Sequence, residues 1–290
     1  MRDWSHLTSQ CSNVEEVPSA SNAASVLVTG AGRGIGKRLA IGFASRGAKV
    51  GLLARSKAEI DLCHLEIGHA GGNASRILAD VRDYERMTAV MHQMRIDLGG
   101  VDVLVCAAAV QGPIGPFVET QPKAWKETLE TNLLGVMNCC RAVLPQMIER
   151  RSGKIIVIAG GGAREGRPNF SLYAATKTAL VRFVESVAAE VSEHNVQINC
   201  MSPGGSYTHM TDQILSAGER AGWREIEDAQ QVRLTGGVAP EQQVELAFFL
   251  ASEQSNHITG RLLHVQDNWK KLKDKTVNPE LYTLRRVQRV

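Results

Sequence analysis

The chain has 290 residues, of which 43% are hydrophobic and 22% charged, with a net charge of +3. This balance is typical of a globular protein with a full core, and the small charge argues against nucleic acid or an anionic membrane as the partner. No apolar run approaches the roughly 18 residues that span a bilayer, and the first ten residues lack the apolar core of a signal peptide. Six cysteines without a CxxC pair or a His/Cys cluster predict reduced thiols in a cytoplasmic protein and no metal site.

Residues 1–24 are polar and show no hydrophobic period, so we expect a flexible N-terminal arm. From residue 25, short Val/Ile/Leu runs alternate with amphipathic segments of helix length. The expected strands are 25–29, 49–53, 101–106, 154–158, 196–201 and 261–265, with a further strand before Asp80. The expected helices include 35–46, 57–69, 84–98, 123–149 and 172–193. The alternation predicts one α/β domain over 25–268, a doubly wound parallel sheet with helices on both faces, followed by a basic tail over 269–290.

A glycine-rich turn lies between the first expected strand and the first expected helix, in VLVTGAGRGIGKRLA (26–40). At the carboxyl end of a strand, a helix N-terminus attracts a pyrophosphate, and glycines let the backbone approach it. The glycines are Gly30, Gly34 and Gly36, in the order T-G-x-x-x-G-x-G rather than G-x-G-x-x-G. This pattern predicts a dinucleotide site; the alternative is a turn that only tightens the packing of strand and helix.

The end of the second expected strand indicates which nicotinamide binds. An acidic side chain there holds the ribose 2′-hydroxyl of NAD, whereas an arginine suits the 2′-phosphate of NADP. The chain has Arg55 at this place and Arg33 inside the glycine turn, so NADP is predicted over NAD unless both arginines are merely solvated. Asp80 follows the third strand and is expected either to accept a hydrogen bond from adenine or to cap the next helix.

Tyr173 and Lys177 lie four residues apart near the start of an expected helix, so both side chains project from one face. A lysine ammonium beside a phenol lowers the pKa of the phenol from about 10. A tyrosine of this kind can give or take a proton at a carbonyl or alcohol oxygen while hydride moves to or from nicotinamide. The pair therefore predicts an oxidoreductase.

With these motifs on one chain, the sequence resembles the single-domain short-chain dehydrogenase/reductase family over about residues 25–265. The segments that carry the resemblance are TGAGRGIG (29–36), ADV (79–81), TNLLG (131–135), YAATK (173–177), SPGGSYT (202–208) and LASEQSNHITGRLLHV (250–265). The resemblance implies a Rossmann-like fold, an NAD(P) cofactor and a small-molecule carbonyl or alcohol substrate. It also implies a homodimer or homotetramer, packed through the apolar stripes of helices 123–149 and 172–193.

Site roles carried over from the family fall on residues of these motifs. Tyr173 would be the acid/base, Lys177 would bind the nicotinamide ribose and tune the tyrosine, and Asn132 would hold a water in the proton relay. The three glycines of the turn would line the pyrophosphate. Pro203, Gly204 and Thr208 would border the carboxamide of the nicotinamide. The implied cofactor site comprises Gly30, Arg33, Gly34, Ile35, Gly36, Arg55, Asp80, Val81, Tyr173, Lys177, Pro203, Gly204 and Thr208.

The chain departs from the family's pattern at two places. The catalytic serine, thirteen residues before the tyrosine, is here Gly160, and the N-N-A-G segment after the fourth strand is CAAA (106–109). Loss of one donor to developing charge can cost roughly 10²–10³-fold in rate. Backbone N–H groups of 160–162 could replace the hydroxyl, or a hydroxyl of the substrate or of Ser171, Tyr207 or Thr208 could reach in. Ser171 is otherwise expected to be a helix N-cap, and a site with neither replacement would do little chemistry.

These observations predict an NADP-dependent oxidoreductase that interconverts a carbonyl and a secondary alcohol. The segment from Pro203 to Gly236 is expected to be a substrate lid, whose polar residues favour a polar substrate unless they only form a helix's solvent face: His209, Thr211, Asp212, Arg220 and Arg224. Two alternatives stay open: an NADP-binding pseudoenzyme or regulatory subunit, and a lyase or epimerase that keeps NADP bound. Trp269 and the tail are expected to close a pocket or an interface, unless the tail is solvated.

Overall fold

The computed structural model describes residues 24–273, 276–278 and 280–285, so the arm predicted over 1–24 lies outside the described residues apart from Ala24. A parallel sheet of seven strands forms the centre of the molecule, in the order β3-β2-β1-β4-β5-β6-β7. Its strands are β1 (Ser25–Thr29), β2 (Lys49–Ala54), β3 (Asn73–Leu78), β4 (Val103–Cys106), β5 (Gly153–Ile158), β6 (Val196–Ser202) and β7 (Leu262–His264). The predicted doubly wound α/β fold is confirmed.

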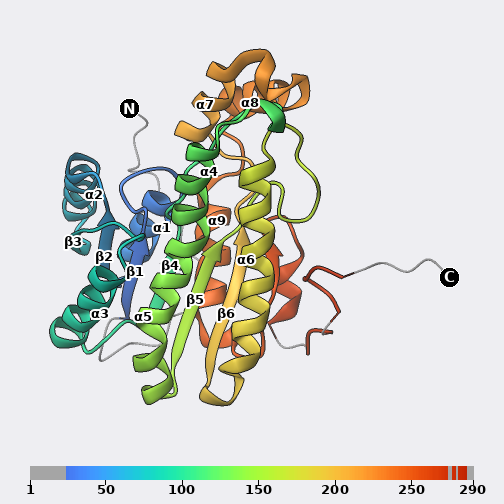
Figure 1. Cartoon of the computed structure of the whole chain (residues 1–290). Helices are drawn as coiled ribbons and strands as arrows, with labels where there is room; N and C mark the ends of the chain where they lie inside the picture. Colours follow the sequence, from blue (N-terminus) through green and yellow to red (C-terminus); the bar gives the residue numbers. More distant parts are fainter. Residues whose placement is uncertain (1–23, 274–275, 279, 286–290) are drawn as a thin grey trace.

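Helices cover both faces of this sheet (Figure 1). One face carries α1 (Gly34–Ser45), α2 (Lys57–His69) and α9 (Pro240–Ala251). The other face carries α3 (Tyr84–Leu98), α5 (Gly135–Arg150) and α6 (Ser171–Glu190). All residues of β1, β4 and β5 are buried, which explains why these segments are nearly continuous apolar runs in the sequence. Short 3-10 turns are η2 (Phe117–Glu119), η4 (Ser192–His194), η6 (Glu253–Ser255) and η7 (Trp269–Leu272).

The segment predicted as one helix over 123–149 is three elements in the structure. These are α4 (Pro122–Leu129), a π-helical turn η3 (Glu130–Leu134), and α5. A π turn inserts an extra residue into the helical ladder and is frequent at functional sites. Here it carries Asn132, whose side chain is completely buried.

Beyond the carboxyl ends of the strands lies the segment that the sequence predicts as a lid. It consists of α7 (His209–Ala217), the 3-10 turn η5 (Gly218–Ala221) and α8 (Trp223–Thr235), drawn in orange at the top of Figure 1. A separate apolar cluster joins this lid to the beginning of α6; its buried members are Phe170, Tyr173, Ile214, Ala221 and Ala229. The lid is therefore packed directly over the predicted catalytic tyrosine.

The described part of the tail packs against its own subunit. Trp269 is 6% exposed and stacks on Phe249 with a centroid distance of 5.1 Å, so it belongs to the core and does not close a pocket. The carbonyl of Tyr282 accepts a hydrogen bond from the Leu262 N–H at 2.7 Å, along β7. Within the described residues, no helix is long and apolar enough to cross a bilayer, and no group of His, Cys, Asp and Glu is placed to hold a metal.

Candidate active site

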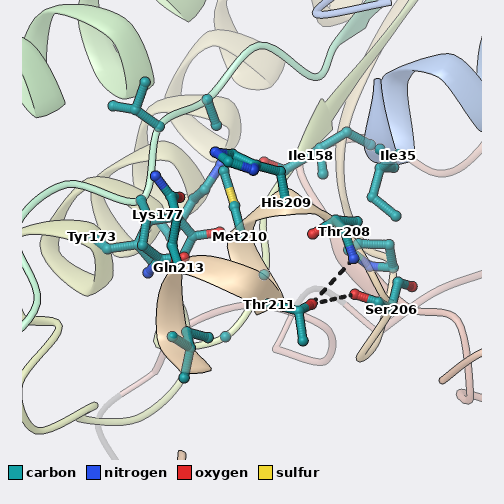
Figure 2. A pocket seen from close by; sticks show the side chains of 18 of the residues that line it. Ile35, Ile158, Tyr173, Lys177, Ser206, Thr208, His209, Met210, Thr211 and Gln213 are labelled. Atoms are coloured by element: carbon teal, nitrogen blue, oxygen red, sulfur yellow. Dashed lines mark hydrogen bonds between the residues drawn. The ribbon is translucent and has the colours of Figure 1, made fainter. Parts of the chain in front are cut away.

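A cleft of about 1210 Å³ opens at the carboxyl ends of the strands, between the glycine turn, the beginning of α6 and the lid. Figure 2 shows Tyr173 and Lys177 on one side, Ile35 of the glycine turn on the other, and the start of the lid between them in this view. The volume exceeds the roughly 300–1,000 Å³ of an ordinary small-ligand pocket, so it has room for more than one ligand. Every residue of the predicted cofactor site lines it: Gly30, Arg33, Gly34, Ile35, Gly36, Arg55, Asp80, Val81, Tyr173, Lys177, Pro203, Gly204 and Thr208.

The glycine turn is closed so tightly that a side chain would not fit at Gly30 or Gly36. Gly30 has φ +67°, and a Cβ there would stand 2.8 Å from the backbone N of Ala108. A Cβ on Gly36 would stand 2.2 Å from the carbonyl oxygen of Gly30. Gly34, with φ +55°, faces Thr208, whose Cγ2 would lie 3.4 Å from an added Cβ. This bare backbone at the N-terminus of α1 is the cradle that a pyrophosphate requires, so the residues fit a dinucleotide.

Two arginines stand at the end of the cleft that follows β2. The side chain of Arg33 is 55% exposed and lies 3.4 Å from Glu59; that of Arg55 is 46% exposed and lies 3.7 Å from Asp80. Burial opposes the ionisation of Asp80, but hydrogen bonds from the side chain and backbone N–H of Arg82 outweigh it and hold the pKa of Asp80 below its ordinary value. Both arginines are thus held loosely. The structure also places the Asp80 carboxylate next to Arg55, a proximity that the sequence alone did not predict.

Asp80 is not a helix cap. The N-cap of α3 is Asp83, whose carboxylate accepts a hydrogen bond from the Arg86 N–H at 2.9 Å. The alternative role expected for Asp80 as an N-cap is therefore wrong, because α3 begins three residues further along the chain. Asp80 instead lines the cleft, and its contact with adenine stays a prediction.

Tyr173 and Lys177 both point from α6 toward the carboxyl end of β5. The Lys177 ammonium donates a hydrogen bond to the Ile158 carbonyl at 2.8 Å and lies 5.5 Å from the centre of the Tyr173 ring. Both residues are buried, with 8% of Tyr173 and 3% of Lys177 exposed. The structure thus brings together the two side chains that the sequence pairs by spacing.

The protonation of this pair differs from the prediction. Burial raises the pKa of Tyr173 above its ordinary value of 10, and the cation that opposes this rise is Arg167. Burial also lowers the pKa of Lys177 to about 8. The predicted lowering of the tyrosine pKa by Lys177 is therefore wrong for this structure, because removal from water outweighs the neighbouring charge for both groups.

Replacing Lys177 by methionine is expected to raise the free energy of unfolding more at pH 7 than at pH 10. Between pH 8 and 10.5 the unfolded chain holds a proton that folded Lys177, with its pKa of about 8, has lost, so the folded state gains stability as pH rises. Below pH 8 the buried ammonium carries its full cost, roughly 3 kcal/mol. Urea unfolding of both proteins at pH 7, 9 and 10 measures the difference, and a difference independent of pH would contradict the lowered pKa.

Asn132 does not line the cleft but supports the loop that does. Its Oδ1 accepts from the Val110 N–H at 2.8 Å, and its Nδ2 donates to the Val110 carbonyl at 2.9 Å. Nδ2 also lies 3.4 Å from Oγ1 of Thr176 on α6. The π turn, the loop after β4 and α6 are thereby tied together behind Tyr173; the role of Asn132 in a proton relay stays a prediction.

The segment CAAA (106–109) has lost polar side chains, yet its backbone is held. The N–H groups of Ala107 and Ala108 both donate to Oγ1 of Thr29, at 3.1 and 3.2 Å. Thr29 is the last residue of β1, the neighbour of β4 in the sheet. Thr29 therefore holds the backbone of this segment in the absence of polar side chains on it.

Position 160 lies beside the tyrosine hydroxyl, because a Cβ built on Gly160 would stand 3.3 Å from that oxygen. Gly160 has φ +148° and Gly162 has φ +87°, so a serine at 160 would be strained. Among the described residues, the N–H groups of Gly160, Gly161 and Gly162 have no hydrogen-bond acceptor, whereas the Gly160 carbonyl accepts from Ala163 N at 3.1 Å. Backbone donors are therefore available where the hydroxyl is missing.

The other candidate hydroxyls are placed differently from what the sequence suggests. Ser171 is the exposed first residue of α6, whose N-cap is Phe170, so its expected capping role is wrong. Tyr207 lies outside the cleft lining and donates its hydroxyl to Asp212 at 2.7 Å. Thr208 does line the cleft, and its N–H donates to Oγ1 of Thr211 at 3.1 Å (Figure 2).

Of the polar lid residues, His209, Thr211 and Arg224 line the cleft. Asp212 is engaged by Tyr207, and Arg220 pairs with Glu119 at 2.8 Å away from the cleft lining. The lid therefore divides its polar groups between the cleft and surface contacts, and the preference for a polar substrate stays a prediction.

Sequence reasoning missed several cleft residues. Arg167 and Glu225 form a bidentate ion pair between the loop before α6 and the lid, with both distances at 2.6 Å. Gln111 and Thr131 also line the cleft, and within the described part of the chain Nε2 of Gln111 and Oγ1 of Thr131 are buried without a hydrogen-bond partner. In the sequence, Arg167 lies in AREGRPNF (163–170) and Glu225 lies in WREIED (223–228). The two segments are far apart along the chain, so no local pattern predicts that these residues form a pair.

Comparisons with known proteins agree with the fold and the cleft. The family model described as short chain dehydrogenase matches residues 24–218. The chain is 33% identical over 239 residues to the 3-oxoacyl-[acyl-carrier-protein] reductase FabG of Escherichia coli (strain K12), covering 82% of this chain and 94% of that one. It is 31% identical over 244 residues to the FabG reductase of Staphylococcus aureus (strain Mu50 / ATCC 700699), covering 83% and 96%.

Solved structures show the same similarity. An actinorhodin polyketide ketoreductase with NADPH superposes with a TM-score of 0.77 at 28% identity, covering 84% of this chain and 95% of that one. A gluconate 5-dehydrogenase from Burkholderia cenocepacia J2315 in complex with NADP and tartrate superposes with a TM-score of 0.74 at 28% identity, covering 84% and 93%. The similarity extends over nearly the full length of both neighbours.

Proposed function

This chain belongs to the short chain dehydrogenase family and is an NAD(P)-dependent oxidoreductase, and we propose that it uses NADP to interconvert a carbonyl and a secondary alcohol on a small polar substrate. The observation that carries the proposal is one cleft with a bare glycine cradle at one end and the buried pair Tyr173 and Lys177 at the other. The pseudoenzyme alternative is not favoured, because the relatives of this chain include 3-oxoacyl reductases and because Tyr173 and Lys177 are in place.

When bound, the nicotinamide supplies or accepts the hydride. The glycine turn would hold the pyrophosphate, Lys177 the nicotinamide ribose, and Pro203, Gly204 and Thr208 the carboxamide. In the direction of reduction, Tyr173 gives its hydroxyl proton to the carbonyl oxygen; its raised pKa keeps that proton in place at neutral pH. The unpaired N–H groups of the glycine loop around Gly160 are available to the same substrate oxygen.

NADPH oxidation followed at 340 nm against a panel of ketones and keto-sugars tests this proposal. We expect turnover with at least one of them and slower turnover with NADH. Tight binding of NADPH without turnover on any substrate would support the pseudoenzyme. Cofactor carried through purification, with product formed and no net oxidation, would support a lyase or epimerase.

Replacing Arg55 by alanine is expected to raise the KM for NADPH about 10- to 100-fold, the effect of losing a charge-assisted hydrogen bond to phosphate. The KM for NADH should change little, because NAD carries no 2′-phosphate. Arg76→Ala is the matched control, since Arg76 is an exposed arginine on β3 that lies outside the cleft lining. Equal effects on both cofactors would show that Arg55 does not select NADP.

Assembly into a homodimer or homotetramer stays a prediction from the family, and a cytoplasmic location stays a prediction from the pattern of cysteines. Light scattering at micromolar concentration decides the first, and a monomer would contradict it.

A further inference from the structure

Arg167 stands in the loop between β5 and α6, and its guanidinium is held in one orientation. Its Nε and Nη2 donate to the two carboxylate oxygens of Glu225 on α8, each at 2.6 Å. The side chains are only 17% and 22% exposed. Bidentate pairing fixes the plane of a guanidinium as well as its position, so this arginine is preorganised.

The guanidinium lies against the catalytic end of the cleft. Its central carbon is 4.1 Å from the ring centre of Phe170 and 5.6 Å from that of Tyr173. A Cβ built on Gly161 would have Nη1 of Arg167 as its nearest neighbour, at 3.8 Å. The guanidinium of Arg167 therefore lies within van der Waals reach of the glycine loop, beside the tyrosine.

Nη1 is the nitrogen of Arg167 that Glu225 does not bind. It donates to no group among the described residues, although Arg167 lines the cleft. A purely structural ion pair between the lid and the domain would not need to lie in the cleft beside Tyr173. It would also not need to leave one guanidinium nitrogen, Nη1, without an acceptor. Two N–H donors at a fixed place next to the reacting group are suited to a substrate oxygen.

The positions of the Tyr173 hydroxyl and of Nη1 along the glycine loop indicate which oxygen of the substrate Arg167 would bind. The Tyr173 hydroxyl faces position 160, at 3.3 Å from its built Cβ, whereas Nη1 faces position 161, at 3.8 Å. The guanidinium carbon of Arg167 lies 5.6 Å from the centre of the Tyr173 ring, so a ligand whose reacting oxygen meets the tyrosine can present a neighbouring oxygen to the arginine. Glu225 already pairs with the guanidinium, and its carboxylate would repel an anion at Nη1, which favours an uncharged second oxygen.

We propose that Arg167 is a substrate-binding residue that donates from Nη1 to an uncharged oxygen next to the reacting carbonyl, and that the substrate is an α-hydroxy ketone or the matching vicinal diol. This inference rests on the proposed carbonyl–alcohol chemistry and specifies its substrate. Glu225 acts as the positioning residue, because it holds the arginine and is carried by the lid.

The test compares 2-hydroxycyclohexanone with cyclohexanone as substrates of the full-length enzyme with NADPH. The wild type is expected to favour the hydroxy ketone in kcat/KM. Arg167→Leu should lower kcat/KM for the hydroxy ketone about 10- to 100-fold, the range for a hydrogen bond to a charged group, and for cyclohexanone less than about threefold. Arg167→Lys, which keeps the charge but loses the fork, should show the same direction of change with a smaller loss.

Arg220→Leu is the matched control. Arg220 pairs with Glu119 at 2.8 Å and also ties the lid to the rest of the domain, but it does not line the cleft. Its removal should leave the preference between the two ketones unchanged, and the dissociation constant of NADPH should be the same in all variants.

Equal losses for both ketones in Arg167→Leu, or a loss of preference in Arg220→Leu, would overturn the inference and leave the proposed function standing. A wild type that oxidises NADPH with other ketones but does not favour the hydroxy ketone would overturn it as well. A wild type without turnover on any ketone would overturn the proposed function itself and this inference with it.

Discussion

Tyr173→Phe is expected to lower kcat for ketone reduction about 10²- to 10⁴-fold, the range for loss of a general acid. The phenyl ring keeps the packing with Phe170 and Ile214 under the lid, so only the hydroxyl is removed. The raised pKa of Tyr173 makes it a proton donor at neutral pH, and no neighbouring side chain is expected to replace it. NADPH oxidation at 340 nm measures the loss, with the best ketone of the panel as substrate.

Tyr207→Phe is the matched control for this change. Tyr207 lies at the start of the lid, does not line the cleft, and gives its hydroxyl to Asp212 at 2.7 Å. It should retain nearly full activity and bind NADPH with the affinity of the wild type. If Tyr173→Phe kept more than a tenth of the activity, the proton would have to come from another group, and the assignment of Tyr173 would be wrong.

Gly36→Ala is expected to weaken NADPH binding by about 100-fold. This is the change in dissociation constant that corresponds to the free-energy cost of forcing an extra methyl group into a packed site. The added Cβ would stand 2.2 Å from the Gly30 carbonyl oxygen and 3.3 Å from Cβ of Ala107. The first of these atoms is backbone and cannot turn away as a flexible side chain could. The glycine turn must therefore shift, which moves the N–H groups that would face the pyrophosphate. Fluorescence titration with NADPH measures the change.

Gly68→Ala is the control for this substitution, because Gly68 also lies within a helix, α2, and nothing stands within 4 Å of its built Cβ. Alanine there should raise the stability by up to about 1 kcal/mol and leave NADPH binding unchanged. If both variants bound NADPH equally well, the turn would not have the tight closure seen in the structure.

A loop of three glycines, residues 160–162, stands where the family's catalytic serine is expected. Gly160 and Gly162 have positive φ angles, which glycine adopts without strain. A serine restored at position 160 would have to adopt φ +148° or move the loop away from Tyr173. The glycine loop places backbone N–H groups beside the Tyr173 hydroxyl, and their use in place of the serine hydroxyl stays a proposal.

Local patterns were sufficient for most of the fold and for part of the site. Buried parallel strands such as β1 and β5 are apolar on both faces, so their runs stand out in the sequence. The spacing of the glycines in the turn, and of Tyr173 and Lys177 on one helix face, is set by residues close together in the chain. The predicted cofactor residues accordingly meet in one cleft.

Where local reasoning was wrong, contacts between distant segments decided the outcome. One helix was expected over 123–149, but a π turn interrupts it where Asn132 binds the loop after β4. Trp269 was expected to help close a pocket or an interface, but it packs on Phe249 in the core and does not line the cleft; the interface stays a prediction.

By itself, the sequence determined the order of strands and helices, the bare glycine turn and the tyrosine–lysine pair, because each depends on neighbours along the chain. Only the tertiary structure decided the raised pKa of Tyr173 and the lowered pKa of Lys177, since burial is the sum of contacts from many segments. It also decided the pairing of Arg167 with Glu225, which are 58 residues apart in the chain. An ion pair of that kind forms only when folding removes both charges from water at the same place, and no local pattern of residues encodes that event.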